Sequence, residues 1–168
     1  MGYLATDIAR YGLKKRRWLL AWLRGHSFFA VFDYRVANWL YRHHVRVLPD
    51  IIMAHVRRHY ACEISPYATI GGGFFIPHTV GIVIGHEVVI GENSEVFQNV
   101  TIGSNRKERN GRYMPVIGNN VSIGSGAVVV GAINIGDNVR IGANSYVDKD
   151  VPANTIVAGV PAKVIKSV

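Results

Sequence analysis

Aliphatic residues recur at every sixth position over most of the chain from residue 64 onward. A helix repeats every 3.6 residues and an alternating strand every two, so neither regular element explains a period of six. Glycine often follows the aliphatic residue directly, which predicts a turn after each short strand. The positions in this register are Ile64, Ile70, Ile76, Ile84, Ile90, Val96, Ile102, Ile117, Ile123, Val129, Ile135, Ile141 and Val147.

The repeat predicts a coil of three short strands whose aliphatic side chains point inward. Gly, Asn and Asp suit the turns because they tolerate positive φ. Stacked coils bury one continuous aliphatic core, and each coil is stable only against its neighbours. We therefore predict a mainly β chain, with a parallel β-helix of hexapeptide repeats over residues 63–168.

The first 62 residues follow a different period and predict a short α-helical region. Apolar and aromatic residues recur there three and four positions apart, as one face of a helix requires. Phe28, Phe32 and Trp39 belong to this pattern, and Pro49 suits the first turn of a later helix. We expect two regions, a helical one over residues 1–62 and the β-helix after it.

The six-residue register is interrupted twice. It stretches to eight residues after Ile76, so two extra residues lie around His78. It stretches to fifteen after Ile102, so a loop leaves the coil at residues 104–115. The loop sequence, SNRKERNGRYMP, is polar and basic. Solenoids commonly carry binding groups on such insertions, which makes this loop a candidate binding element.

Positive charge is concentrated in the helical region. Residues 1–60 hold 11 Lys/Arg against 3 Asp/Glu, whereas residues 61–168 hold 8 of each. A basic run at residues 14–17 precedes Trp18 and Trp22, and Trp39 follows. Basic residues beside such aromatics suit helices that lie on an anionic membrane surface. The alternative is that the helices cap the open end of the β-helix and the charges are solvated. No recognition motif suggests nucleic-acid binding.

Cys62 is the single cysteine, so neither an intrachain disulfide nor a cysteine metal cluster can form. A lone cysteine is usually a small buried hydrophobe. The apolar block at residues 18–23 is far shorter than the roughly 20 residues of a membrane span. We expect a cytoplasmic protein, peripheral at the inner face of the membrane if its helices bind lipid.

Several stretches resemble the left-handed β-helix acyltransferases: IGENSEVFQNVTIG, VIGNNVSIGSGAVVVGAINIGDNVRIGANSYV and the ending VPANTIVAGVPAKVI. The segment IPHTVGIVIG, with its two extra residues, resembles the serine acetyltransferase branch. The short helical N-terminus is similar to that of bacterial polysaccharide O-acetyltransferases. The resemblance implies acetyl-CoA as co-substrate and a homotrimer whose active sites lie between adjacent subunits.

His78 matches the catalytic base of the family. A neutral imidazole can accept a hydroxyl proton while the oxygen attacks the thioester. Glu63 is the expected orienting partner, because it precedes the strand at Ile64 while His78 follows the strand at Ile76. Both then occupy one corner of the coil on consecutive turns, and stacked strands lie about 4.8 Å apart. A carboxylate there would hold the imidazole in the productive tautomer.

The resemblance also implies a groove for acetyl-CoA. Backbone groups at small turn residues would bind the pantetheine arm, and Arg140 and Lys163 could reach the phosphates. The small residues in the matching positions are Gly103, Ser104, Ser125, Gly142 and Ala143. His86 adds a second histidine to the repeat region. A three-histidine zinc site would need a third, so we predict no metal.

The acceptor site departs from serine acetyltransferases. Those carry an Arg-His pair before the proline of the loop and an Asp before the catalytic His. Here Tyr113 and Met114 precede the loop proline, and Pro77 precedes His78. With Arg112, the first two are the expected acceptor contacts. Because the charged clamp for an amino-acid carboxylate is missing and tyrosine suits a sugar face, we expect O-acetylation of a sugar in a polysaccharide or lipid-linked glycan.

Three alternatives remain open. The first is serine O-acetylation, and the second is N-acetylation of an amino sugar. The third is a trimeric scaffold that binds a membrane without catalysis, although His78 speaks against it.

Overall fold

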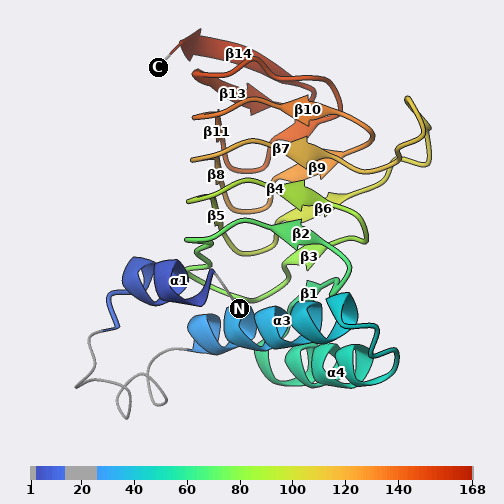
Figure 1. Cartoon of the computed structure of the whole chain (residues 1–168). Coiled ribbons are helices and arrows are strands. Elements are labelled where there is room, and N and C mark those ends of the chain that lie inside the picture. Colours follow the sequence, from blue (N-terminus) through green and yellow to red (C-terminus); the bar gives the residue numbers. More distant parts are fainter. Residues whose placement is uncertain (1–2, 14–25, 168) are drawn as a thin grey trace.

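The computed structural model describes residues 3–13 and 26–167 (Figure 1). The basic run at residues 14–17, with Trp18 and Trp22, lies outside these ranges. Helix α1 spans Leu4–Arg10, α3 spans His26–Arg42 and α4 spans Leu48–Tyr60. Pro49 lies in the first turn of α4, as its sequence position predicts, and Ala61 ends that helix in the left-handed conformation.

From Glu63 onward the chain forms a parallel β-helix, which confirms the predicted fold. Its strands lie in three sheets, ordered β1-β3-β6-β9-β12, β10-β7-β4-β2 and β14-β13-β11-β8-β5. All neighbours are parallel except β13 and β14, which form an antiparallel pair at the top of Figure 1. The strands are β1 (Glu63–Ile64), β2 (Thr69–Ile70), β3 (Val83–Ile84), β4 (Val89–Ile90), β5 (Glu95–Val96), β6 (Thr101–Gly103), β7 (Val116–Ile117), β8 (Ser122–Ile123), β9 (Val128–Val130), β10 (Asn134–Ile135), β11 (Arg140–Ile141), β12 (Tyr146–Val147), β13 (Thr155–Gly159) and β14 (Ala162–Ser167).

The repeat positions stack one above another inside the coil. In the first sheet, Ile64 pairs with Ile84, Ile84 with Ile102, Ile102 with Val129 and Val129 with Val147. All five are at most 2% exposed. Full burial of such a side chain contributes about 1.5–3 kcal/mol, so these columns supply most of the driving force for stacking.

Asparagine shapes many of the turns between strands. Six turn asparagines adopt positive φ between 56° and 59°, a conformation that asparagine tolerates better than most residues. Some also stack, since Asn120 donates to Asn138 at 3.1 Å and Asn138 donates to Asn154 at 2.8 Å. The turns therefore repeat as regularly as the core. The six are Asn93, Asn99, Asn120, Asn138, Asn144 and Asn154.

The helices cap the open end of the first coil. The Tyr34 hydroxyl donates to the Ala68 carbonyl at 2.8 Å, and the Asn38 amide donates to the same oxygen at 3.0 Å. On the side of the first coil that follows β2, the Ile76 N–H donates to the Tyr11 hydroxyl at 2.8 Å. Backbone groups at a sheet edge would otherwise need water or another strand. The capping alternative weighed for the helices is thus realised by these side chains.

A buried ion pair forms the centre of this cap. Asp7 is fully buried and Arg35 is 8% exposed, and their charged atoms lie 2.8 Å apart. Arg35 also donates to the carbonyls of Ile70 and Gly71, while Asp7 accepts the Phe74 N–H at 3.0 Å. Arg35 is one of the 11 basic residues of the helical region, which were expected to be solvated or to face lipid, and for Arg35 that expectation is wrong. Its guanidinium replaces the strand that would have lain beneath the first coil.

Within residues 3–13 and 26–167, no helix combines the length and apolar character that crossing a bilayer would require.

Candidate active site

Two corners of the β-helix flank the sheet β1-β3-β6-β9-β12, and they hold most of the predicted site residues. The corner before this sheet, here called the His78 corner, comprises the turns at residues 77–82, 97–100, 124–127 and 142–145. The corner after it, the loop corner, includes residues 85–88 and the long loop. Ser125, Gly142 and Ala143 lie on the His78 corner. Gly103, Ser104, Arg112, Tyr113 and Met114 lie on the loop corner.

The turn with His78 stacks directly on the start of β1. Gly81 donates its N–H to the Ala61 carbonyl at 2.8 Å, and Glu63 donates its own to Ile82 at the same distance. Glu63 and His78 therefore share a corner on consecutive coils, as their spacing predicts. His78 is exposed. The Glu63 carboxylate, 58% exposed, lies 3.8 Å from Arg57, an exposed pairing worth little. The contact between Glu63 and His78 stays a prediction.

The two predicted phosphate-binding cations lie apart. Lys163 is on β14, opposite Ala158 of β13. Ala158 packs over Gly142, where an added Cβ would come within 2.9 Å of the Ala158 methyl group. Lys163 thus lies near the upper end of the His78 corner. Arg140 instead lines a separate cavity of about 410 Å³ on the outer face of β11, with Arg10 and Glu95 among its neighbours.

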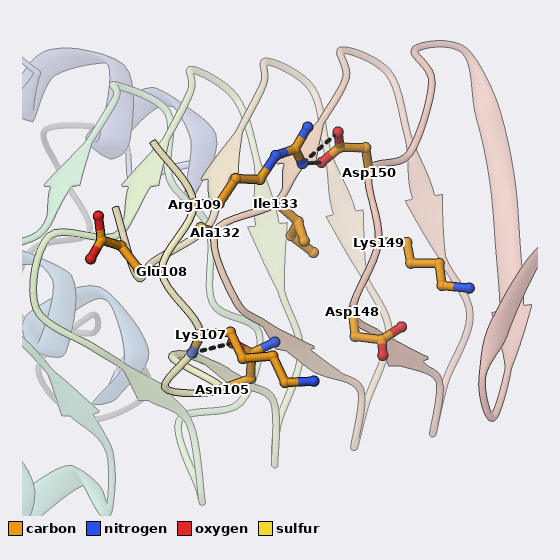
Figure 2. Close-up of a pocket in the computed structure, with 9 residues that line it drawn as sticks. All are labelled: Asn105, Lys107, Glu108, Arg109, Ala132, Ile133, Asp148, Lys149 and Asp150. Atoms are coloured by element: carbon orange, nitrogen blue, oxygen red, sulfur yellow. Dashed lines mark hydrogen bonds and ion pairs between the residues drawn. The ribbon is translucent and has the colours of Figure 1, made fainter. Parts of the chain in front are cut away.

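The long loop lies against the next two coils, at the turns that follow β9 and β12 (Figure 2). Arg109 donates to both carboxylate oxygens of Asp150 at 2.8 Å. The backbone N–H of Asn134 and the Arg109 guanidinium lower the pKa of Asp150 below its usual value. Arg112 donates to the Asn134 side chain at 3.1 Å, and Tyr113 donates to Glu108 at 3.1 Å. These bonds hold the loop over a cavity of about 350 Å³ (Figure 2).

Two glycines on the coil have different surroundings. An added Cβ at Gly103 would meet nothing within 4 Å, so space is open beside this strand end. At Gly131, with φ +99°, a Cβ would lie 2.6 Å from the Asn105 amide. Gly131 is therefore needed for the close approach of the loop, whereas Gly103 leaves room for a ligand.

On the loop corner of the first coils, toward the helical cap, the rings of His86 and Tyr67 lie close together. The ring of His86 lies 4.6 Å from that of Tyr67, and His86 Nδ1 lies 3.2 Å from the Ser65 hydroxyl. The Tyr67 hydroxyl donates to Asp50 at 3.2 Å, which ties the cluster to α4. A Cβ added at Gly85 would come 3.5 Å from the Met114 side chain, so His86 lies next to the end of the loop.

Gln98 is a residue that the sequence analysis missed. It lies on the His78 corner, one coil above the histidine. Its Oε1 is buried, and no described side chain or backbone group donates a hydrogen bond to it. In the sequence it resembles any polar turn residue. The available signal was that small Ser125 and Ala143 hold the corresponding positions of the next two coils.

The sequence profile of the family described as "Bacterial transferase hexapeptide (six repeats)" matches residues 114–149. Serine acetyltransferase of Synechococcus elongatus is 43% identical over 139 residues, which are 83% of this chain and 57% of that protein. The chain thus spans little more than half the length of this curated relative.

Solved structures agree along almost the whole chain. Serine acetyltransferase of Brucella abortus in complex with coenzyme A has a TM-score of 0.88 and 32% identity, covering 99% of this chain and 67% of that one. Serine acetyltransferase of Neisseria gonorrhoeae in complex with serine has a TM-score of 0.86 and 30% identity, covering 98% and 68%.

These relatives overturn the expected sugar acceptor. That expectation rested on a few residues near the acceptor, chiefly Tyr113, Met114 and Pro77, and on the short N-terminus. The similarity to serine acetyltransferases instead extends through the helical cap and every coil, because the fold matches over 98–99% of the chain. The departures at Tyr113, Met114 and Pro77 are therefore local differences within a chain that otherwise matches serine acetyltransferases. The chain belongs to the serine acetyltransferase family of hexapeptide-repeat transferases.

Proposed function

We propose that this protein is an acetyl-CoA-dependent serine O-acetyltransferase. The observation that carries the proposal is the match of 99% of the chain to a relative that binds coenzyme A, together with the match to one that binds serine. His78 lies at an exposed turn beside the stripe of small residues that would contact the pantetheine arm.

The chemistry requires one base and an accessible thioester. The serine hydroxyl oxygen would attack the acetyl carbonyl while His78 accepts the hydroxyl proton. The new C–O bond forms, the C–S bond breaks, and the proton passes to the departing thiolate of coenzyme A. Glu63 would orient the imidazole, and Lys163, near the upper end of the His78 corner, would attract the phosphates of the co-substrate.

The activity is tested by mixing the protein with acetyl-CoA and L-serine. Free thiol release should depend on serine, and mass spectrometry should detect O-acetylserine. The single cysteine should add little background, because burial raises the pKa of the Cys62 thiol to about 12. No O-acetylserine above the level of a His78→Ala control would contradict the proposal.

The absent Arg-His pair predicts weak serine binding. Tyr113 is 43% exposed and uncharged, so it cannot form an ion pair with the serine carboxylate. Replacing Tyr113 with Arg and Met114 with His should lower KM for serine about 10-fold or more, because hydrogen bonds to charged groups contribute about 1.5–3 kcal/mol. Steady-state kinetics at saturating acetyl-CoA would measure this. An unchanged KM, with kcat intact, would remove these positions from the acceptor site.

We also propose a homotrimer. The predicted site residues occupy two corners on opposite edges of one sheet, so a site that used both would need two chains. Val83 and Val128 lie at outward positions of that sheet, and Val83 is 39% exposed in the single chain. Light scattering should give three times the 18.5 kDa subunit mass. A monomer with full turnover would refute the trimer.

The α3–α4 turn supports the proposed contact with an anionic membrane surface. Val47, Leu48 and Ile51 are 68%, 45% and 58% exposed, and Arg42 and Arg46 flank them. Apolar side chains that insert beside cations favour an anionic bilayer. Vesicles containing phosphatidylglycerol should sediment the protein, and the binding should weaken with salt.

Leu48→Gln with Ile51→Gln should reduce that vesicle binding several-fold. The matched control is Val164→Gln with Ile165→Gln, which removes two apolar side chains of similar exposure, 54% and 62%, from β14 at the other end of the molecule (Figure 1). Equal losses in both pairs would argue against a specific surface. A change in oligomeric mass with the first pair would assign the turn to a subunit contact instead.

A further inference from the structure

His86 is an exposed imidazole that its neighbours hold from two sides. Its Nδ1 lies 3.2 Å from the Ser65 hydroxyl, and its ring centroid lies 4.6 Å from that of Tyr67. Tyr67 is itself held by Tyr41, whose ring lies edge-on to it at 4.5 Å, and by Asp50, which accepts from its hydroxyl at 3.2 Å. Packing and hydrogen bonds of this kind fix the orientation of a side chain that meets a ligand.

The contact with Ser65 determines which ring nitrogen of His86 carries the hydrogen. Ser65 is 6% exposed, and its hydroxyl oxygen already accepts the N–H of Tyr67 at 3.2 Å. Within the described residues, the acceptor for the Ser65 hydroxyl hydrogen is Nδ1 of His86. In a neutral imidazole one nitrogen accepts and the other donates, so Nε2 carries the hydrogen. No group in the described part of the chain pairs with Nε2, which leaves an N–H donor available.

This donor lies beside the end of the long loop. A Cβ added at Gly85 would lie 3.5 Å from the Met114 side chain, so Met114 packs against the turn that carries His86. Arg112 and Tyr113, the polar residues expected to contact the acceptor, each donate to another side chain of the protein. The His86 donor therefore lies at the expected acceptor site and has no such partner.

His86 and His78 of one chain are too far apart to contact the same serine molecule. His78 precedes β3 and His86 follows it, so the width of the sheet separates them. A three-fold rotation keeps every residue at its own height along the axis. In the proposed trimer, with the axis along the β-helix, the coil of β3, β4 and β5 in one subunit meets the same coil of the next. His86 is then brought to the His78 corner of a neighbouring subunit.

We infer that His86 is a specificity-determining residue whose Nε2–H binds the carboxylate of serine, in an active site whose His78 belongs to the neighbouring subunit. The inference rests on the proposed serine O-acetyltransferase activity and on the proposed trimer. A hydrogen bond to a carboxylate is stronger than one to a neutral oxygen. The contact would thus favour an amino acid over an uncharged alcohol as acceptor.

His86→Phe tests the contact, because it keeps a ring against Tyr67 and removes the donor. KM for serine should rise about 10-fold, as expected for the loss of one hydrogen bond to a charged group. The Kd for coenzyme A should stay unchanged. L-serinamide has no carboxylate, so its KM should change less than about twofold. Equal rises of both KM values, or an unchanged KM for serine, would overturn the inference.

Two further variants at this position separate the hydrogen bond from packing. His86→Ala makes no demand on packing and should raise KM for serine as His86→Phe does, whereas His86→Gln restores an N–H donor and should recover part of the affinity. The matched control is Glu87→Gln, which changes the next exposed residue of the same turn. It should raise KM for serine less than about twofold. A rise equal to that of His86→Phe would contradict a specific role for His86.

Mixed assemblies test the sharing of the site between subunits. The His78→Ala chain keeps His86 but lacks the base, and the His86→Phe chain keeps the base but lacks the carboxylate donor. Co-expression of the two chains should create sites with the wild-type KM for serine, because adjacent subunits supply one intact histidine each. Absence of such low-KM activity would overturn the inference.

The failures of the two proposals can be told apart. If the wild type acetylates serine and His86→Phe has the same KM, the inference alone is wrong. If the wild type binds coenzyme A but does not acetylate serine, the proposed function is wrong and the inference falls with it.

Discussion

Replacing His78 with alanine should lower kcat for acetyl transfer about 10²–10⁴-fold, the usual contribution of a general base. A serine hydroxyl is a poor nucleophile until its proton is removed, and His78 is the exposed imidazole at the turn beside the proposed groove. Steady-state kinetics with acetyl-CoA and serine would measure the loss. Binding of coenzyme A should be nearly unchanged, because the variant removes a proton acceptor and leaves the groove intact.

Glu63→Ala is the companion variant and should cost less activity, because it disorients the base without removing it. The Arg57→Met variant separates this role from the ion pair that Glu63 forms in the structure. If Glu63 acts through His78, the Arg57 variant should retain activity. A His78→Ala protein with more than about a tenth of wild-type activity would end the assignment, since the loss of a base costs more than that.

Replacing Arg35 with methionine should lower the free energy of unfolding by about 3–5 kcal/mol, the range for breaking a buried pair by removing one partner. The variant leaves the fully buried Asp7 carboxylate without its counter-ion. It also removes the donors to the carbonyls of Ile70 and Gly71. Chemical denaturation at one fixed protein concentration would measure the change, because the assembly state also affects stability.

The double variant Asp7→Leu with Arg35→Met should recover part of that loss, because no lone charge remains buried. Arg109→Met is a surface comparison, since the Arg109–Asp150 pair has the same 2.8 Å separation but side chains that are 50% and 43% exposed. It should cost less than about 1 kcal/mol. Equal losses for Arg35 and Arg109 would mean that burial does not govern the strength of these pairs.

The architecture was predictable from the sequence because one constraint repeats. Every coil needs an inward aliphatic residue and a tight turn. The spacing of Ile64, Ile84 and Ile102 therefore predicts both the strands and their stacking. The longer gap after Ile102 likewise located the loop. A pattern that recurs in each coil can be recognised in the sequence, because each repeat supports the assignment of the others.

The cap was not predictable in the same way. Asp7 and Arg35 are 28 residues apart, and Phe74 is 67 residues from Asp7. Each of these contacts is made at one place in the chain and does not recur with the repeat. A charged residue in an amphipathic helix is therefore expected to face solvent unless its partners are known. Arg35 was therefore grouped with basic surface residues, although its guanidinium is buried.

The candidate site was partly predictable. The shared corner of Glu63 and His78 followed from counting repeats, and the backbone bonds at Ala61 and Ile82 agree with it. Whether the two side chains are in contact depends on their rotamers and on the ion pair between Glu63 and Arg57. The spacing of residues in the sequence determines neither. Gln98 was missed because the burial of its side-chain oxygen without a described donor is a property of three-dimensional surroundings.

The position of the cap at the N-terminal end has a consequence for how the chain is made. A ribosome delivers α1, α3 and α4 before any coil, so the surface on which the first coil forms already exists when Glu63 emerges. Each later coil then finds a completed neighbour, and assembly can propagate in the direction of translation. A cap at the other end would have left the outer edge of the first coil open, and exposed to pairing with other chains, until the cap itself had been made.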